Sequence, residues 1–159
     1  MTKVLVTYFS STGNTKSLAE AVAEGVRSVE GVTCELKTVP HTTNDDWLAA
    51  DGIIVGSPTY FGQMAGRVKQ MFDVTAQVYG KLEGKVGGAF TTSGGAGCGH
   101  ETAIMSILTA MLVAGMVVRG TTEGPHFGPF AVGQPNDDAL QAAREMGARV
   151  AGLTKKLFP

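Results

Sequence analysis

The sequence has few cysteines, the residues that form the disulfide bonds and metal sites of many small domains. It contains only two cysteines, Cys34 and Cys98, in 159 residues, and their spacing matches neither a set of metal ligands nor a disulfide framework. A chain of this length buries roughly 70% of the surface that it exposes when unfolded, so it can be stable without disulfide bonds or bound metal. We therefore expect one domain over residues 1–159, with no metal site.

Long hydrophobic runs and an excess of charge are also missing. No apolar run reaches the roughly 18 residues of a membrane-spanning helix, and the first residues lack the basic and apolar pattern of a signal peptide. With 13 Lys and Arg against 14 Asp and Glu, the net charge is −1. This balance favours neither nucleic acid nor an anionic membrane as a partner. We expect a soluble, cytoplasmic protein that binds neither of them.

Several motifs of other α/β proteins are absent as well. The P-loop pattern G-x-x-x-x-G-K-[ST] does not occur, and the dinucleotide pattern G-x-G-x-x-G does not follow the first expected strand. A phospho-accepting receiver domain needs acidic residues after its first and third strands, where this chain has Ser10-Ser11 and Ser57-Pro58. A low-molecular-weight phosphatase needs an arginine six residues after its cysteine, but Ile104 stands there after Cys98. Both classes fit the sequence poorly.

What the sequence does contain is a regular alternation of strand-like and helix-like segments. Five βα units in series predict an open parallel sheet with helices on both faces. In such sheets, ligands bind outside the carboxyl ends of the strands, at the topological switch point. We expect strands at 3–9, 32–39, 52–56, 85–92 and 116–120, helices at about 18–29, 45–50, 64–79, 100–114 and from 136 onward, and a long Gly/Pro-rich loop at 121–135.

The loop after the first expected strand is rich in hydroxyl groups and directly precedes a helix. The first backbone N–H groups of a helix have no internal partner, and the helix dipole adds positive potential there. Together with the hydroxyls, they can hold a phosphate dianion by neutral donors alone. A terminal monophosphate suits this loop better than a pyrophosphate. The residues expected to bind it are Ser10, Ser11, Thr12, Gly13, Asn14 and Thr15.

The loop after the third expected strand carries two adjacent aromatic residues, Tyr60 and Phe61. Loops usually contain such residues only where these bury against something, and a flat heteroaromatic ring is one such partner. Pro58 makes the turn rigid, while Thr59 and Gly62 leave backbone groups free to meet polar atoms of the ring. We therefore expect this segment, 58–62, to line the ring of the cofactor.

The loop after the fourth expected strand has four glycines within six residues. Such a loop lets the backbone approach a ligand closely and present N–H groups to it. Because all three loops follow strands at the same edge of the sheet, one ligand with a phosphate and a flat ring, FMN, can contact all of them. The residues of the third loop that we expect to contact it are Thr92, Ser93, Gly94, Gly95, Gly97 and Gly99.

Several of these segments resemble the flavodoxin-like superfamily and, within it, the WrbA-type NAD(P)H:quinone oxidoreductases. The similarity runs through nearly the whole chain, and PTYFGQMAG is its most specific part. The matching stretches are KVLVTYFSSTGNT, SLAEAVAEGV, GSPTYFGQMAGRVKQMFD, YGKLEGKVGGAFTTSG, GHET, AGMVV and RVAGLTKKL. The resemblance implies a three-layer α/β/α fold with a five-stranded parallel sheet in the strand order 2-1-3-4-5.

The resemblance also implies roles for the three loops. Ser10 and residues 12–15 would hold the FMN phosphate, Thr59, Tyr60 and Phe61 would line the isoalloxazine, and residues 92–97 would contact the ribityl chain and the pyrimidine. Transfer of two electrons from NAD(P)H to a quinone, in a tetramer that completes each site, is implied as well. The chain differs from the family at Thr12, where an aromatic residue is usual, and at Ala114, where a histidine is usual. It is also shorter near residues 41–44 and 75–79.

Two functions follow from these observations. The first is an FMN-dependent oxidoreductase, in which no side chain acts as a nucleophile because the cofactor supplies the chemistry. Its substrate side is expected to include His100, His126 and Phe127. The second is a flavodoxin-type electron carrier between redox proteins; such carriers are usually strongly acidic, which a net charge of −1 does not match. Either protein can be a homo-oligomer, as a dimer or a tetramer.

Overall fold

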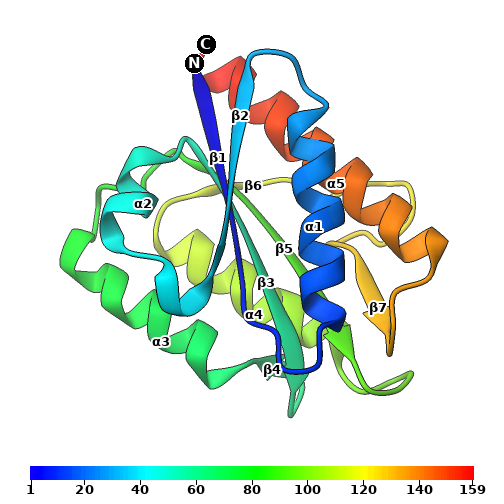
Figure 1. Cartoon of the computed structure of the whole chain (residues 1–159). Coiled ribbons are helices and arrows are strands. Elements are labelled where there is room, and N and C mark those ends of the chain that lie inside the picture. Colours follow the sequence, from blue (N-terminus) through cyan, green and yellow to red (C-terminus); the bar gives the residue numbers. More distant parts are fainter.

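A computed structural model describes residues 1–159, and its strands form one sheet between two layers of helices (Figure 1). The strands are β1 (Thr2–Tyr8), β2 (Val32–Thr38), β3 (Gly52–Tyr60), β4 (Gln63–Met64), β5 (Val86–Ser93), β6 (Val117–Val118) and β7 (Phe130–Val132). The helices are α1 (Asn14–Arg27), α2 (Asn44–Ala49), α3 (Gly66–Val74), α4 (His100–Val113) and α5 (Asp137–Leu157), with short 3₁₀ helices η1 (Val39–His41) and η2 (Thr75–Val78).

The sheet has seven strands, so the expected number of five is wrong. Its main path runs β2-β1-β3-β5-β6 with all neighbours parallel, while β4 pairs antiparallel with β3 and β7 pairs parallel with β5. If β4 is not counted, β5 and β6 are the fourth and fifth strands, and the path is the expected order 2-1-3-4-5. One additional strand, β4, forms because the chain turns back after Tyr60 and pairs with β3. The other, β7, pairs with β5 where β6, reduced to Val117–Val118, does not reach.

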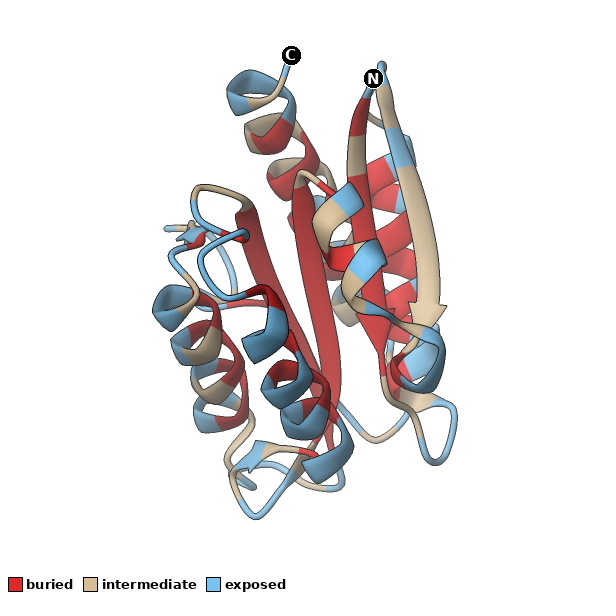
Figure 2. Cartoon of the chain, turned by 90° about the vertical axis from the view of Figure 1, so that its left-hand side faces the viewer, coloured by how far each residue is buried: buried red, intermediate tan, exposed pale blue.

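Alternation along the central strands divides the core into two halves. Leu5, Ile53 and Val55 point to the face covered by α2, α3 and α4, whereas Val6 and Ile54 point to the face covered by α1 and α5. Because both faces are covered, the three central strands are almost continuously buried, and Figure 2 shows them mostly in red. This arrangement leaves the carboxyl ends of the strands as the open edge of the sheet.

The helices begin where local sequence favours them. Asn136 caps α5 as expected, since its side-chain oxygen accepts a hydrogen bond of 2.9 Å from the backbone N–H of Ala139. Thr43 and Asp46 form a capping box at the start of α2. The expected helix at 64–79 is shorter, because its first residues form β4 and its end is the 3₁₀ helix η2. None of the helices is both long enough and apolar enough to cross a membrane.

Candidate functional site

The three polar loops expected to share a ligand meet in one pocket at the carboxyl edge of the sheet. The pocket has a volume of about 270 Å³. It lies between the start of α1, the end of β3 and the end of β5, so each wall comes from a different βα connection. It is called the three-loop pocket below. Its lining residues are Ser11, Thr12, Asn14, Thr15, Pro58, Thr59, Tyr60, Thr92, Ser93 and Gly94.

The N-terminus of α1 opens onto this pocket without a side-chain cap. Gly13 is the N-cap residue and has a φ of 95°, a left-handed conformation that favours glycine. No side chain accepts a hydrogen bond from the first turn, and the backbone N–H groups of Asn14, Thr15 and Lys16 have no partner within the chain. Three free donors at the positive end of a helix are an arrangement that binds an anion.

Threonine pairs connect the three loops to one another. The hydroxyls of Thr15 and Thr92 lie 2.7 Å apart and are buried, which joins the start of α1 to the end of β5. The Thr91 hydroxyl donates to the carbonyl of Ser57 at 2.7 Å, so in its 2.9 Å contact with Thr59 it accepts the proton. These bonds fix the loops relative to one another before any ligand binds.

The second loop forms the tip of a β-hairpin. Tyr60 pairs with Gln63, so Phe61 and Gly62 are the two central residues of the turn, with φ values of 52° and 71°. Positive φ at both positions is typical of a type I′ turn. Phe61 is the only residue other than glycine with a positive φ, and its side chain is fully exposed. A bulky residue in this conformation, with no contact to stabilise it, points to a role in binding.

The third loop packs against that hairpin. A Cβ atom on Gly99 would lie 2.7 Å from the Cα of Gly62, so only glycine permits this approach of the two backbones. Gly99 is also the N-cap residue of α4. Gly94 lines the three-loop pocket, whereas Gly95 and Gly97 lie further along the loop and do not line it. The glycine-rich loop therefore contributes its first residues to the pocket and its last residue to packing.

Not every residue expected at the site lies in this pocket. Ser10 and Gly13 face a neighbouring hollow on the other side of the first loop. The His100 ring stacks on Phe130, with ring centroids 3.9 Å apart, and its buried Nδ1 atom has no hydrogen-bond partner. His126 and Phe127 line a separate cavity beside β5. His126 and Phe127, which were expected on the substrate side, thus lie outside the three-loop pocket, and their role toward substrate stays a prediction.

The sequence reasoning missed the hollow that Ser10 and Gly13 face. It measures about 460 Å³ and is lined in addition by Tyr8, Phe9, Lys16, Thr38 and Pro40. The Arg67 guanidinium lies 5.6 Å from the centroid of the Phe9 ring. Lys16 directly follows the phosphate-type loop in sequence, which is a signal that could have been used. Arg67 could not be found in this way, because only the fold brings α3 next to the end of β1.

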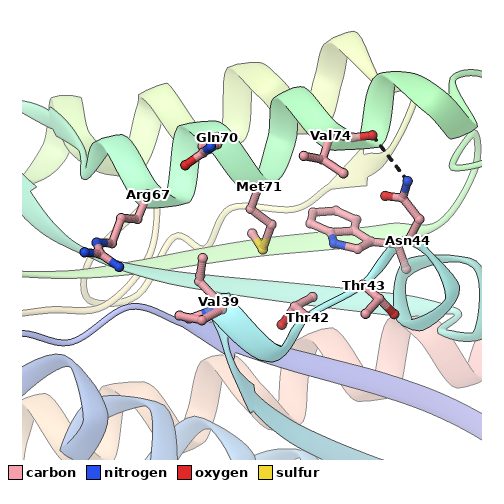
Figure 3. Close-up of a pocket in the computed structure, with 10 residues that line it drawn as sticks. Val39, Thr42, Thr43, Asn44, Arg67, Gln70, Met71 and Val74 are labelled. Carbon is pink, nitrogen blue, oxygen red and sulfur yellow. Dashed lines mark hydrogen bonds between the residues drawn. The ribbon is translucent and has the colours of Figure 1, made fainter.

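Another pocket, drawn in Figure 3, contains none of the expected site residues. It lies between α3 and the segment of η1 and α2, has a volume of about 270 Å³, and is lined by residues such as Val39, Arg67 and Met71. The Asn44 amide donates to the carbonyl of Val74 at 3.3 Å across one end of it. The buried Trp47 forms part of its wall and packs edge-on against Phe72.

The lining of the three-loop pocket consists of neutral hydroxyl, amide and backbone groups, with one aromatic ring. It contains no lysine, arginine, histidine, aspartate or glutamate side chain. Nor does the chain contain any group of three His, Cys, Asp or Glu residues that could hold a metal ion. Such a donor set fits a phosphate held by helix N–H groups and hydroxyls, beside an aromatic ring system. These residues therefore fit FMN, and the phenol of Tyr60 is their only ionisable side chain.

Comparison with known proteins agrees with this geometry. The family model of the NADPH-dependent FMN reductases matches residues 41–124. A flavodoxin of Aquifex aeolicus is 44% identical over 159 residues, covering 95% of this chain and 86% of that relative. An NAD(P)H dehydrogenase (quinone) of Syntrophobacter fumaroxidans is 34% identical, covering 98% of both chains. The crystal structure of a WrbA-like flavodoxin from Agrobacterium tumefaciens superposes with a TM-score of 0.84, at 28% identity and with 98% and 99% coverage.

Proposed function

The chain belongs to the flavodoxin-like superfamily and, within it, to the WrbA-type NAD(P)H:quinone oxidoreductases, and from this membership we propose how its residues serve that chemistry. The protein is an FMN-dependent oxidoreductase. It oxidises NAD(P)H to NAD(P)⁺ and reduces a quinone or a similar acceptor to the hydroquinone, with two electrons and two protons added to the acceptor. Residues 1–159 form one FMN-binding domain, and the supporting observation is that all strands join one sheet.

The FMN phosphate is held by the start of α1. The observation that carries this proposal is the set of free N–H groups of Asn14, Thr15 and Lys16, next to the hydroxyls of Ser11 and Thr12. The absence of a lysine or an arginine from the lining is no obstacle, because helix N–H groups bind a dianion together with the helix dipole. The Thr15–Thr92 hydrogen bond keeps this loop against the end of β5.

The ring system of FMN lies between the second and third loops in this proposal. Tyr60 lines the pocket and is only partly exposed, and the exposed Phe61 stands next to it at the hairpin tip. Ser93 and Gly94 of the third loop line the same pocket. When bound, FMN supplies redox chemistry between a hydride donor and a quinone. Tyr60 and Phe61 would orient the ring by aromatic contact.

An electron carrier is the second candidate function. The relative described as a flavodoxin supports it, because it is 44% identical to this chain over an alignment of 159 positions that covers 95% of this chain. The alignment with the quinone dehydrogenase of Syntrophobacter fumaroxidans spans 200 positions, so it contains gaps opposite this shorter chain. The net charge of −1 favours the enzyme, since carriers dock through strongly charged surfaces. A homo-oligomer and a cytoplasmic location stay predictions.

Anaerobic stopped-flow absorbance tests the enzyme directly. FMN-loaded protein is mixed with NADH and, separately, with NADPH, while absorbance of the oxidised flavin is followed. We expect one of the two donors to bleach the flavin band within seconds, and benzoquinone to restore it. This result also identifies the preferred donor.

A different result would favour the carrier. In that case neither donor bleaches the band on this timescale, whereas stepwise addition of dithionite reduces the flavin in two separate one-electron stages. Free FMN at the same concentration is the control, because it reports the rate of reduction without the protein.

A further inference from the structure

A second cavity lies beside β5, and it shares no lining residue with the three-loop pocket. Its volume is about 620 Å³, which is more than twice that of the three-loop pocket and within the range of small-molecule sites. Its walls come from β5, α4, α5 and the segment that runs from β6 to β7 (Figure 1). It is called the β6–β7 cavity below.

The cavity exists because the edge of the sheet is interrupted. Strand β6 pairs with Val86 and Gly87 of β5, and β7 pairs with β5 only from Thr91 onward. Gly88 and Ala89 therefore have no strand beside them on that edge, and both line the cavity together with Gly87. The side chains of Met111 and Val150 already pack against Gly87 and Gly88, within 2.7 Å and 3.0 Å of where a Cβ atom would lie. The room for a ligand therefore comes from the gap between β6 and β7 along this edge.

The walls of this cavity are mostly apolar. Met105, Leu108 and Leu112 of α4 line one side, and Met146 of α5 lines another. Phe127 stands at the opening and is 47% exposed, although it is large and apolar. Methionine side chains adapt to ligands of different shape, because they are unbranched and flexible. The cavity is thus suited to an apolar body.

One strongly polar group is set into these apolar walls. The Nε atom of Arg149 is buried and has no hydrogen-bond partner, and Arg149 forms no ion pair. Burial lowers its pKa, the nearby Arg119 lowers it further, and Glu145 raises it. Glu145 is nevertheless engaged elsewhere, since it accepts a hydrogen bond of 2.9 Å from Gln141. Arg149 as a whole is half-buried, and its buried Nε–H donor is left without a partner. A buried donor of this kind is costly, and native proteins usually satisfy it.

The segment at the opening is held in place by its own hydrogen bonds. The backbone N–H of Thr121 donates to the carbonyl of His126 at 3.1 Å, and the His126 ring donates through Nδ1 to the carbonyl of Thr121 at 3.0 Å. Arg119, on the same segment, lines the cavity and is exposed to solvent. Two cationic side chains, the half-buried Arg149 and the exposed Arg119, therefore line the same space with no carboxylate beside them.

We propose that the β6–β7 cavity binds an organic carboxylate with an apolar body, whose carboxylate is held by Arg149 and Arg119. The guanidinium fork of arginine matches a carboxylate by two parallel hydrogen bonds. Two arginines in mostly apolar walls, with few other donors, suit one carboxylate better than a phosphate, which needs more donors. This inference does not depend on the proposed flavin chemistry, because the two sites share no lining residue.

Calorimetric titration with sodium octanoate tests the proposal, with the protein loaded with FMN so that the flavin site is filled. Octan-1-ol is the matched neutral probe of the same chain length. We expect octanoate to bind at one site per chain, and about tenfold or more tighter than octan-1-ol, because a hydrogen bond between charged groups is lost with the alcohol. Amide chemical-shift changes in a ¹H–¹⁵N NMR spectrum should centre on Gly87, Gly88 and Ala89.

Two variants separate binding from folding. R149M should weaken octanoate binding about tenfold or more and leave octan-1-ol binding unchanged. Its thermal midpoint without octanoate should be equal to or above that of the wild type, because a buried donor without a hydrogen-bond partner is removed. R119M, at the exposed opening, should weaken octanoate binding by a smaller factor. R144M is the control, since Arg144 lies on the same helix but pairs with Glu24 at 2.7 Å.

Three results would overturn the proposal. Octanoate binding that does not saturate, or that R149M leaves unchanged, would show that Arg149 holds no carboxylate. Shift changes centred on Thr12 and Thr59 would place the probe in the flavin pocket instead. If the protein sediments as a dimer and octanoate does not bind to it, the cavity does not take a carboxylate in the protein as it exists in solution.

Discussion

Phe61 is the residue at which local backbone preference and the fold disagree. Its φ of 52° lies in the left-handed region, which costs an ordinary residue roughly 1–2 kcal/mol. No burial offsets this cost, because the side chain is fully exposed. Glycine would adopt the same turn without strain. The retention of an aromatic ring here is explained if the ring contacts the flavin.

Replacing Phe61 by glycine should therefore separate stability from binding. We expect F61G, without FMN, to be as stable as the wild type or more stable by about 1 kcal/mol, because the release of strain exceeds the entropy cost of glycine. FMN affinity should fall about three- to tenfold, as lost aromatic contact predicts. Urea denaturation and flavin fluorescence titration measure the two quantities.

Tyr79 supplies the control for this experiment. It is 74% exposed and lies outside the three-loop pocket, so Y79A removes an exposed aromatic ring without altering the proposed site. A loss of stability in F61G with unchanged FMN affinity would contradict the role given to Phe61.

Single residues also show what the sequence could and could not reveal about the site. The hydroxyl-rich loop could be found because Ser, Thr and Asn cluster between a strand and a helix, where helix N–H groups are free. The Thr15–Thr92 and Thr59–Thr91 hydrogen bonds could not, since each joins residues far apart in the chain. The β6–β7 cavity was missed for the same reason, because Arg119 and Arg149 come together only in the folded chain.

Among the elements, α1 and α5 approach each other unusually closely. A Cβ atom on Gly147 of α5 would lie 2.1 Å from the backbone oxygen of Val22 in α1, and one on Gly25 would lie 1.9 Å from that of Arg144. Glycines thus allow the two helices to pack backbone to backbone over the same face of the sheet. Gly152, also in α5, has open space around it.

Gly147, which contacts α1, and Gly152, which does not, allow a matched pair of alanine substitutions on α5. G147A should lower the free energy of unfolding by about 2–3 kcal/mol, because the new methyl group meets backbone that cannot move away easily. G152A should raise it by up to about 1 kcal/mol through helix propensity alone. Urea denaturation with far-UV circular dichroism measures both. Equal effects of the two substitutions would show that the α1–α5 contact is looser than described.

The elements that were predicted well are those with strong local patterns. Strand β1 and helix α1 follow from a buried apolar run and from apolar residues at helical spacing. Strand β7 was expected to be loop, because its three residues, Phe130–Val132, lie between Pro129 and Gly133. Its strand conformation comes from pairing with Thr91–Ser93 of β5, and such tertiary pairing overrides local preference.

At the scale of the whole molecule, the edge of the sheet is stabilised by charge. Lys37 of β2 pairs with Glu35 at 2.8 Å and with Asp46 of α2 at 2.6 Å, and Lys3 of β1 pairs with Glu35 at 2.6 Å. Hydrogen bonds from Lys3 and Lys37 lower the pKa of Glu35. Burial raises the pKa of Asp46, but hydrogen bonds from Lys37 and Thr43 outweigh this and lower it overall.

These shifts predict how stability responds to acid. A carboxylate whose pKa is lower in the folded state stabilises the fold above its unfolded pKa, and this contribution is lost as the pH falls through the folded value. The unfolded values are about 4, so stability should decrease as the pH falls below about 4. K37M should be less stable at pH 7 and should lose less stability between pH 4 and pH 2.

Denaturation curves at a series of pH values measure this effect. K156M is the control for the change in charge, because Lys156 forms no ion pair. A K37M profile parallel to that of the wild type throughout would contradict the assignment of acid sensitivity to this network.

The central claim is that the three-loop pocket holds FMN through the start of α1, and equilibrium binding of FMN tests it most directly. Protein freed of flavin is titrated into FMN, and the quenching of flavin fluorescence is followed for the wild type, T15V and S28A. Ser28 lies at the opposite end of α1, where its hydroxyl donates to the carbonyl of Gly25. We predict one FMN per chain, affinity about tenfold or more weaker in T15V, and no change in S28A. Wild-type protein that does not bind FMN, or T15V that binds it as tightly as the wild type, would contradict the account.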